Sequence, residues 1–110
     1  MVNYACIFTI MEIINAFVFN SGYCFEVHYT DVPKEMPKSE RYQWFLYIDS
    51  KLIKLDFKKM DGNQRWFDNG IYLNMDEYEL YYENYIYYSR KCADISPIKE
   101  LLSKEVQIVW

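Results

Sequence analysis

The sequence predicts an α+β fold, in which a mostly antiparallel β-sheet of about four or five strands carries helices on one face. Three observations lead to this prediction. Residues 23–30 alternate between aromatic or aliphatic and mostly polar side chains, and residues 41–48 and 51–58 have the pattern of a hairpin. Residues 10–20 and 74–92 repeat apolar side chains at helical spacing. At 110 residues, the whole chain is expected to form one globular domain.

The first element expected is a helix from Ile10 to about Asn20. Thr9 and Glu12 have the spacing of a capping box, and Ser21-Gly22 would end the helix. The apolar positions that share one helix face are Ile10, Ile13, Ile14, Phe17 and Val18. The β-branched and aromatic content of this segment also suits a strand, which is the alternative. Residues 4–8 are apolar and could form a short strand before it.

A strand and a hairpin are expected next. Residues 23–30 place aromatic and apolar side chains on one face, as a strand with one buried face does. Residues 31–40 contain two prolines and read as an exposed loop. Residues 41–48 and 51–58 are the two strands of a hairpin that closes near Asp49-Ser50. The first of them is apolar on both faces, which is typical of a central strand.

A second hairpin is indicated by Asn69-Gly70, the dipeptide that type I′ turns favour. It would join residues 64–68 to residues 71–73, and Asp61-Gly62-Asn63 would form the turn before it.

The segment from Asn74 to Cys92 is predicted to be an amphipathic helix rich in tyrosine. Asn74 and Glu77 have the spacing of a capping box at its start. One face would gather Met75, Tyr78, Tyr81, Tyr82, Tyr85, Ser89 and Cys92. Leu80 and Tyr87 break the pattern, because they fall on the charged face. The helix is expected to cover the sheet with its tyrosine face and to leave an acidic face exposed.

The end of the chain is predicted to contain a short helix and a final strand. Ser96-Pro97 has the form of an N-cap followed by proline at the first helical position, and the helix would run to about Lys104. Residues 106–110 alternate weakly and could return as a strand.

Composition and charge narrow the classes of function. The net charge of −4 argues against general affinity for nucleic acids or anionic membranes. The three cysteines, Cys6, Cys24 and Cys92, are odd in number and form no CxxC pair, so reduced thiols in a cytoplasmic protein are expected. The apolar run before Phe19 lacks a basic region and contains Glu12, so neither a membrane span nor a signal peptide is expected.

No catalytic or metal-binding pattern stands out. His28 is the single histidine, and the cysteines lack zinc-ligand spacing. Cys24 lies on the same strand face as His28 but about 13 Å away, too far for a dyad, whereas Cys6 or Cys92 could meet His28 in the fold. The sequence contains no nucleotide-binding, hydrolase or EF-hand motif. We therefore expect a protein that is not an enzyme and that needs no cofactor or metal.

The leading hypothesis is a protein-binding inhibitor that neutralises a basic partner. An acidic and aromatic surface complements a basic nuclease in charge, and tyrosine is common among binding hot spots. The expected contact residues are Asp68, Asp76, Glu77, Glu79, Leu80, Glu83 and Tyr87. In its small size, acidic charge and abundant tyrosine, the chain is similar in general style to bacterial immunity proteins and to phage-encoded inhibitors of host defence, including anti-CRISPR proteins. That resemblance implies a toxin or a defence nuclease as the partner.

Two alternatives come from other features. Residues 41–66 interleave basic and aromatic side chains, as single-strand nucleic-acid binders do, although Asp49, Asp56 and Asp61 weaken the positive field. The chain could also be an assembly subunit of a phage or mobile element that oligomerises through strand edges or its tyrosines.

Overall fold

The computed structural model describes the backbone of residues 11–109 and the side chains of residues 11–104. The two sheets in this part of the chain contain five strands each. The strands are β1 (Met11–Phe19), β2 (Gly22–Tyr29), β3 (Tyr42–Ile48), β4 (Lys51–Leu55), β5 (Phe57–Asp61), β6 (Gln64–Phe67), β7 (Tyr72–Asn74), β8 (Glu79–Tyr82), β9 (Tyr85–Tyr88) and β10 (Arg90–Lys91). Two short 3-10 helices, η1 (Lys38–Arg41) and η2 (Asp68–Gly70), and the α-helix α2 (Ser96–Val109) complete the described elements.

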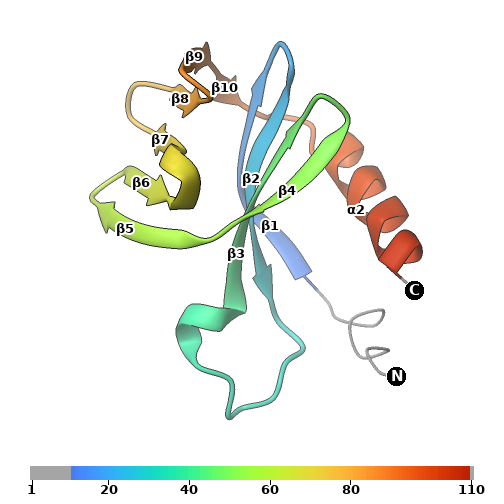
Figure 1. The fold of residues 1–110 in the computed structure, drawn as a ribbon. Helices are drawn as coiled ribbons and strands as arrows, with labels where there is room; N and C mark the ends of the chain where they lie inside the picture. Colours follow the sequence, from blue (N-terminus) through green and yellow to red (C-terminus); the bar gives the residue numbers. More distant parts are fainter. Residues whose placement is uncertain (1–10, 110) are drawn as a thin grey trace.

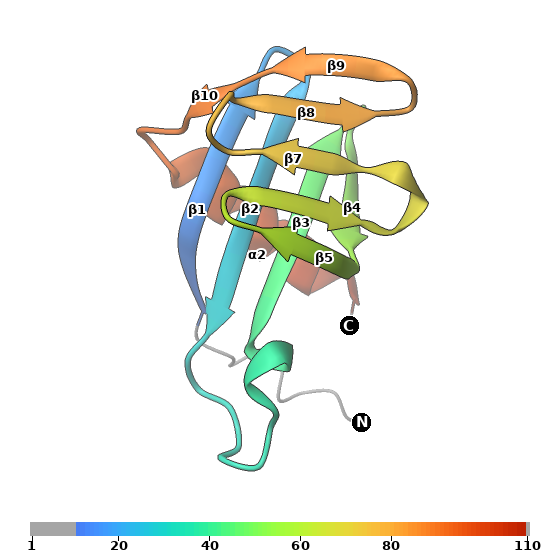
Figure 2. The same cartoon turned by 90° about the vertical axis from the view of Figure 1, so that its left-hand side faces the viewer.

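All strand pairs in both sheets are antiparallel. The first sheet has the order β10-β1-β2-β3-β4, and the second sheet follows the chain from β5 to β9. Asp56 separates β4 from β5, so the chain passes from one sheet to the other there. The strands of the second sheet run across those of the first, and α2 lies on the far side of the first sheet (Figures 1 and 2).

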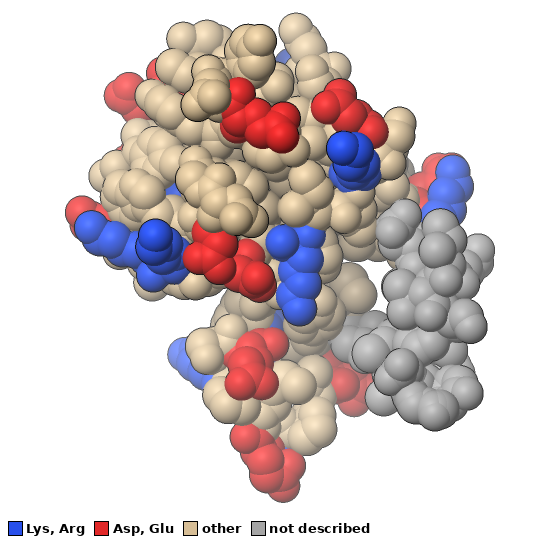
Figure 3. All heavy atoms as spheres, in the orientation of Figure 1, with Lys and Arg blue, Asp and Glu red and all other residues tan. Residues whose placement is uncertain are grey.

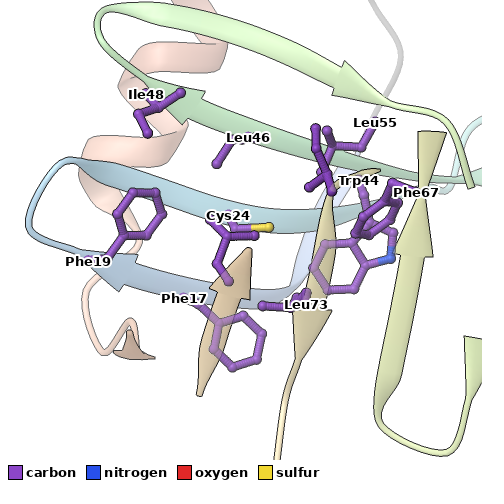
Figure 4. Packing of buried hydrophobic residues seen from close by; sticks show 11 residues of the cluster. Phe17, Phe19, Cys24, Trp44, Leu46, Ile48, Leu55, Phe67 and Leu73 are labelled. Atoms are coloured by element: carbon purple, nitrogen blue, oxygen red, sulfur yellow. The ribbon is translucent and has the colours of Figure 1, made fainter. Parts of the chain in front are cut away.

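The main hydrophobic core lies between the two sheets. Trp44 and Leu46 of the first sheet and Phe67, Leu73 and Leu80 of the second belong to one buried cluster. Figure 4 shows this cluster, with Cys24 among the aromatic and aliphatic side chains. The Trp44 and Phe67 ring centroids are 5.7 Å apart, so the sheets meet through direct aromatic contact.

A second cluster forms on the other face of the first sheet. Phe25 and Val27 of β2 are buried there together with Ile98 of α2, and Leu102 packs against them. Adjacent residues of a strand point to opposite faces, so β2 contributes Cys24 to one cluster and Phe25 to the other. Burial on both faces explains why the central strands β2 and β3 carry apolar side chains at most positions.

The prediction of a helix from Ile10 to about Asn20 is wrong, because the described part of that segment is β1. A register shift between Ile13 and Asn15 in the pairing with β2 changes the phase of the strand. Ile13 and Ala16 therefore pack in the second cluster, whereas Phe17 is buried between the sheets. Because the apolar residues of β1 point to both faces of the sheet and the bulge changes their phase, their spacing resembles that of a helix. The expected strand at residues 4–8 and the Thr9 cap lie outside the described residues.

The prediction of a tyrosine-rich helix from Asn74 to Cys92 is also wrong. This segment contains the end of β7, the hairpin β8–β9 and the short strand β10. Leu80 and Tyr87, which fall on the charged face of the expected helix, are cross-strand partners in the hairpin. Glu83 and Asn84 form the turn with φ values of 50° and 67°, the left-handed conformation that type I′ turns require. The predicted fold class, one sheet of four or five strands covered on one face by an N-terminal helix and a tyrosine-rich helix, is therefore wrong. The described residues form two five-stranded antiparallel sheets and one C-terminal α-helix.

The two hairpins indicated by turn residues are formed, but not with the predicted bounds. The strand expected at residues 51–58 ends at Leu55 as β4, and Phe57–Asp61 is β5 of the second sheet. The connection at Asn69-Gly70 is the three-residue η2 rather than a two-residue type I′ turn. Asp49 and Ser50 connect β3 to β4 with φ values of 52° and 62°. Asn69 and Gly70, at φ 65° and 75°, lie in the connection between the paired strands β6 and β7. The strand at residues 23–30 is confirmed as β2.

The C-terminal helix is confirmed at its start but is longer than predicted. It begins at Ser96, where the backbone N–H donates to Asp94 Oδ1 at 3.0 Å. It continues to Val109, so the strand expected at residues 106–110 is not formed over the described residues. No helix in the described part of the chain is long and apolar enough to span a membrane.

Candidate binding face on the second sheet

The outer face of the second sheet, which points away from the first sheet, presents a row of aromatic side chains. Strand register places Trp66, Tyr72, Tyr81 and Ile86 directly beside one another on β6, β7, β8 and β9. Tyr88 lies two residues from Ile86 and therefore on the same face. We call these five residues the aromatic face.

Contacts between neighbouring strands hold the rings in place. The Trp66 and Tyr72 ring centroids are 5.0 Å apart, and those of Tyr72 and Tyr81 are 5.2 Å apart. Lys59 Nζ lies 4.9 Å from the centroid of the Trp66 ring, within the range of a cation–π contact. Cross-strand aromatic pairs stabilise a sheet and also fix the position of each ring. The row is therefore ordered before any partner binds.

Hydrogen bonds fix the middle of the row further. The Tyr72 hydroxyl donates to Gln64 Oε1 at 2.6 Å, and Asn74 Nδ2 donates to the Tyr72 hydroxyl at 3.2 Å. Gln64 and Asn74 are cross-strand partners on the same face, so the phenol of Tyr72 is held between two amides.

Exposure increases along the row toward β9. Trp66 and Tyr72 are half-buried, whereas the exposed fraction is 37% for Tyr81, 44% for Ile86 and 71% for Tyr88. In Figure 3 this face lies on the left and is seen edge-on, with Lys and Arg side chains toward β5. A contiguous exposed apolar surface of this kind is typical of interaction sites.

Carboxylates border one end of the aromatic face. Asp61 and Glu79 lie in the same cross-strand row as Gln64 and Asn74, and Asp76 and Glu77 follow in the turn between β7 and β8. We call the four carboxylates Asp61, Asp76, Glu77 and Glu79 the acidic rim.

The turn that carries the acidic rim is held by Asn side chains. Asn74 Oδ1 accepts hydrogen bonds from the backbone N–H groups of Asp76 and Glu77, at 2.9 and 3.0 Å. Asn63 Nδ2 donates to Asp76 Oδ1 at 2.8 Å and ties this turn to the neighbouring one. Asp76 and Glu77 therefore project from a turn held by hydrogen bonds, between the strand residues Asp61 of β5 and Glu79 of β8.

The rim changes the electrostatics of Tyr81. The Glu79 carboxylate, together with partial desolvation, raises the pKa of Tyr81 above its ordinary value. The Tyr81 hydroxyl also donates to Glu79 Oε1 at 3.5 Å. A neutral Tyr81 hydroxyl can donate one hydrogen bond and accept others.

The structure brings only part of the predicted contact set together. Asp76, Glu77 and Glu79 form most of the acidic rim, whereas Asp68 and Glu83 lie at the opposite ends of their strands. Glu79 and Glu83 are therefore about 13 Å apart along β8 instead of being neighbours on a helix.

The prediction that Leu80 and Tyr87 are exposed contacts is wrong. Leu80 has no exposed surface and belongs to the core between the sheets. Tyr87 is half-buried, and its ring centroid lies 5.4 Å from that of Phe19. Both side chains point inward because they alternate with the outward-facing Tyr81 and Ile86.

Sequence reasoning missed Trp66, Tyr72, Tyr81, Ile86 and Tyr88 as a joint surface. The available signal was the alternation of residues 79–82 and 85–88 around Glu83-Asn84. The aromatic row needs the register of four strands, which no single segment contains.

The basic and aromatic set proposed for nucleic-acid binding does not form one surface. Trp44 is buried between the sheets, and Lys51 and Lys54 belong to the first sheet, whereas Arg65 and Trp66 belong to the second. Within the set, Lys59 contacts the Trp66 ring. The acidic rim also opposes a polyanion at the aromatic face.

His28, Cys24 and Cys92, the side chains considered for catalysis, do not belong to the aromatic face. The His28 ring stacks on Tyr42 at a centroid distance of 4.6 Å, and burial raises the pKa of the Cys24 thiol. The backbone N–H of Cys92 donates to the Ala16 carbonyl of β1. His28 pairs with Glu12, which is four residues and about 13 Å from Ala16 along β1, so Cys92 and His28 lie apart. Across the described residues, no group of three or more His, Cys, Asp or Glu side chains is arranged to hold a metal ion.

No protein-family model, curated protein or solved structure matches this chain. The candidate site is therefore defined by its own geometry.

Proposed function

We propose that this protein binds a basic partner protein through the aromatic face and the acidic rim. The observation that carries the proposal is the row of aromatic side chains, exposed at Tyr81, Ile86 and Tyr88 and bordered by four carboxylates. Tyrosine and tryptophan provide large contact area at low entropic cost, and the carboxylates attract and orient a cationic partner. An arginine of the partner could stack on Tyr81 and pair with Glu79, which lie two residues apart on one face.

In this proposal the protein acts as an inhibitor that covers a basic surface of its partner. A nuclease presents such a surface, because it must hold a polyanionic substrate. The role would be that of an immunity protein or antitoxin for a toxin, or of a phage inhibitor of a host defence nuclease. Opposite charges would speed the encounter and make it sensitive to salt.

The test compares capture by the tagged wild-type chain with capture by Glu79→Lys, Tyr81→Ala and Glu35→Lys. A lysate of the source cells is treated with nuclease, and bound proteins are identified after low-salt and high-salt washes. Glu35 is exposed in the 31–40 loop, so Glu35→Lys is the matched control with the same change in net charge. We expect one basic protein to bind wild type and Glu35→Lys and to be lost from the other two.

Titration of the purified partner then gives the magnitude of the loss in binding affinity. Removal of a hot-spot tyrosine costs about 2 kcal/mol, so Tyr81→Ala is expected to weaken binding about 30-fold. Nuclease activity of the partner should fall as the wild-type chain is added. Equal affinity of all four proteins for the partner would show that the aromatic face is not the binding site.

A further inference from the structure

The four edges of the two sheets differ in how they are protected against pairing with another strand. β10 consists of two basic residues, Arg90 and Lys91, and β4 carries Lys51 and Lys54. Edge lysines, short strands and bulges are the usual means by which proteins prevent strand addition. In contrast, the edge strand β9 has the sequence Tyr-Ile-Tyr-Tyr, with no charge and no proline.

The two edges of the second sheet show this difference most clearly. β5 carries Lys58 and Lys59, and its pairing with β6 shifts register between Phe57 and Lys59. β9 pairs regularly with β8 over all four of its residues. Among residues 11–109, no strand pairs with the other side of β9. It is therefore a regular, uncharged and exposed edge.

The hairpin geometry identifies which backbone groups of β9 point outward. The Ser89 N–H donates to the Tyr78 carbonyl at 2.9 Å, so this pair is hydrogen-bonded. Hydrogen-bonded and non-hydrogen-bonded pairs alternate in an antiparallel ladder. Leu80 with Tyr87 is therefore hydrogen-bonded, and Ile86 and Tyr88 direct their N–H and C=O groups away from β8.

We infer that β9 pairs antiparallel with β9 of a second copy of this chain. The register that uses both outward residues places Ile86 of one copy opposite Tyr88 of the other, with Tyr87 on the two-fold axis. This register forms two hydrogen-bonded pairs, and shifting it by two residues would require the Asn84 turn or Arg90, which already belongs to β10. The second sheets of the two copies then form one continuous sheet.

Charge and exposure favour a second copy as the occupant. In this register the Glu83 turn of one copy lies toward Arg90 and Lys91 of the other, and all three residues are exposed. The symmetry produces this attraction twice. Tyr85, which is 67% exposed and lies on the inner face of the edge, would be placed opposite Ser89 of the second copy.

The test uses the purified full-length chain without any partner protein. Mass is measured by sedimentation over a range of concentrations for wild type, Ile86→Pro and Met60→Pro. Proline at 86 removes an outward N–H, and two such bonds are lost per dimer. A typical hydrogen bond contributes about fivefold to an equilibrium constant, so the dissociation constant should rise about 30-fold.

Met60→Pro is the matched control on the opposite edge. Met60 is 60% exposed and pairs with Arg65 next to the hydrogen-bonded closing pair of its hairpin, so its N–H also points outward. We expect this variant to dimerise like wild type. A wild-type chain that remains monomeric at all concentrations, or a dimer that Met60→Pro weakens and Ile86→Pro does not, would overturn the proposal.

Amide hydrogen exchange of the wild-type chain tests the register without a substitution. The N–H groups of Ile86 and Tyr88 should exchange more slowly as the concentration rises. Slow exchange that is independent of concentration would contradict the pairing. The outcome is separate from the proposed function, because Tyr81→Ala and Glu79→Lys should leave the dimer intact while they reduce partner binding.

Discussion

At the scale of single residues, Gly22 is a position in the first sheet with no room for a side chain. A Cβ atom built there would lie 1.8 Å from the Tyr47 carbonyl oxygen, which is a backbone atom of the adjacent strand. Because β2 and β3 pair from Gly22 to His28, neither strand can withdraw easily. The absence of a side chain at Gly22 allows the β1–β2 hairpin to approach β3.

We predict that Gly22→Ala destabilises the fold by about 3 kcal/mol, the upper range for overpacking a well-packed site. Urea unfolding followed by circular dichroism would measure the change. Gly62→Ala is the control, since Gly62 has φ +59° but nothing within 4 Å of a Cβ. It should cost only about 1 kcal/mol for the left-handed backbone. Equal losses in the two variants would mean that the close approach at Gly22 does not limit stability.

At the scale of elements, the start of α2 depends on Asp94. The hydrogen bond from the Ser96 backbone N–H lowers the pKa of the Asp94 carboxyl below its ordinary value of 3.8. A carboxyl with a lowered pKa in the folded state stabilises that state above the ordinary pKa. This contribution is lost as the pH falls through the folded-state pKa.

We predict that α2 becomes less stable as the pH is lowered from about 5 to about 2, with Asp94 providing part of the change. Helical circular dichroism and the melting temperature should be measured against pH for wild type and Asp94→Asn. The amide keeps an oxygen acceptor but does not titrate in this range. If the two proteins lose stability in parallel, Asp94 makes no contribution to the pH dependence.

Two hairpins could be predicted from their turn residues, whereas β1 and the β8–β9 hairpin could not. Asp49-Ser50 and Asn69-Gly70 indicated their hairpins because they readily adopt positive φ. Asn74 was misleading, since its Oδ1 accepts from the N–H groups two and three residues later, as a helix N-cap does. The chain leaves the helical path at Tyr78, where φ is 57°.

The candidate site was predictable only where its residues are close in sequence. Asp76, Glu77 and Glu79 are nearly consecutive, so their shared location could be inferred. The aromatic row depends on the pairing of β6 through β9, and pairing register is set by contacts across strands.

At the scale of the whole molecule, the structure separates residues that stabilise from residues that are free to bind. Leu80 and Tyr81 are adjacent in β8, yet one is buried between the sheets and the other lies on the aromatic face. Substitution of Leu80 should therefore reduce stability, whereas substitution of Tyr81 should reduce partner binding.

We predict that Leu80→Ala lowers the free energy of unfolding by about 3 kcal/mol, as expected for a cavity in a packed core. Tyr81→Ala should change it by less than about 1 kcal/mol. Chemical denaturation gives both values, and partner capture by the folded fraction should follow the reverse order. A Leu80→Ala protein as stable as wild type would contradict the burial of this residue between the sheets.

The pairing of β1 with β10 has a consequence for how the protein folds. Phe17 pairs with Lys91 and Val18 with Arg90, so this short ladder joins strands that are far apart in the sequence. Every strand pair of the second sheet is instead between consecutive strands. Local pairs form quickly, whereas pairs between distant residues must first overcome the entropy of closing a long loop. We expect the meander of β5 to β9 to form early and the β1–β10 contact to be among the last, so that the chain completes its first sheet only after its second.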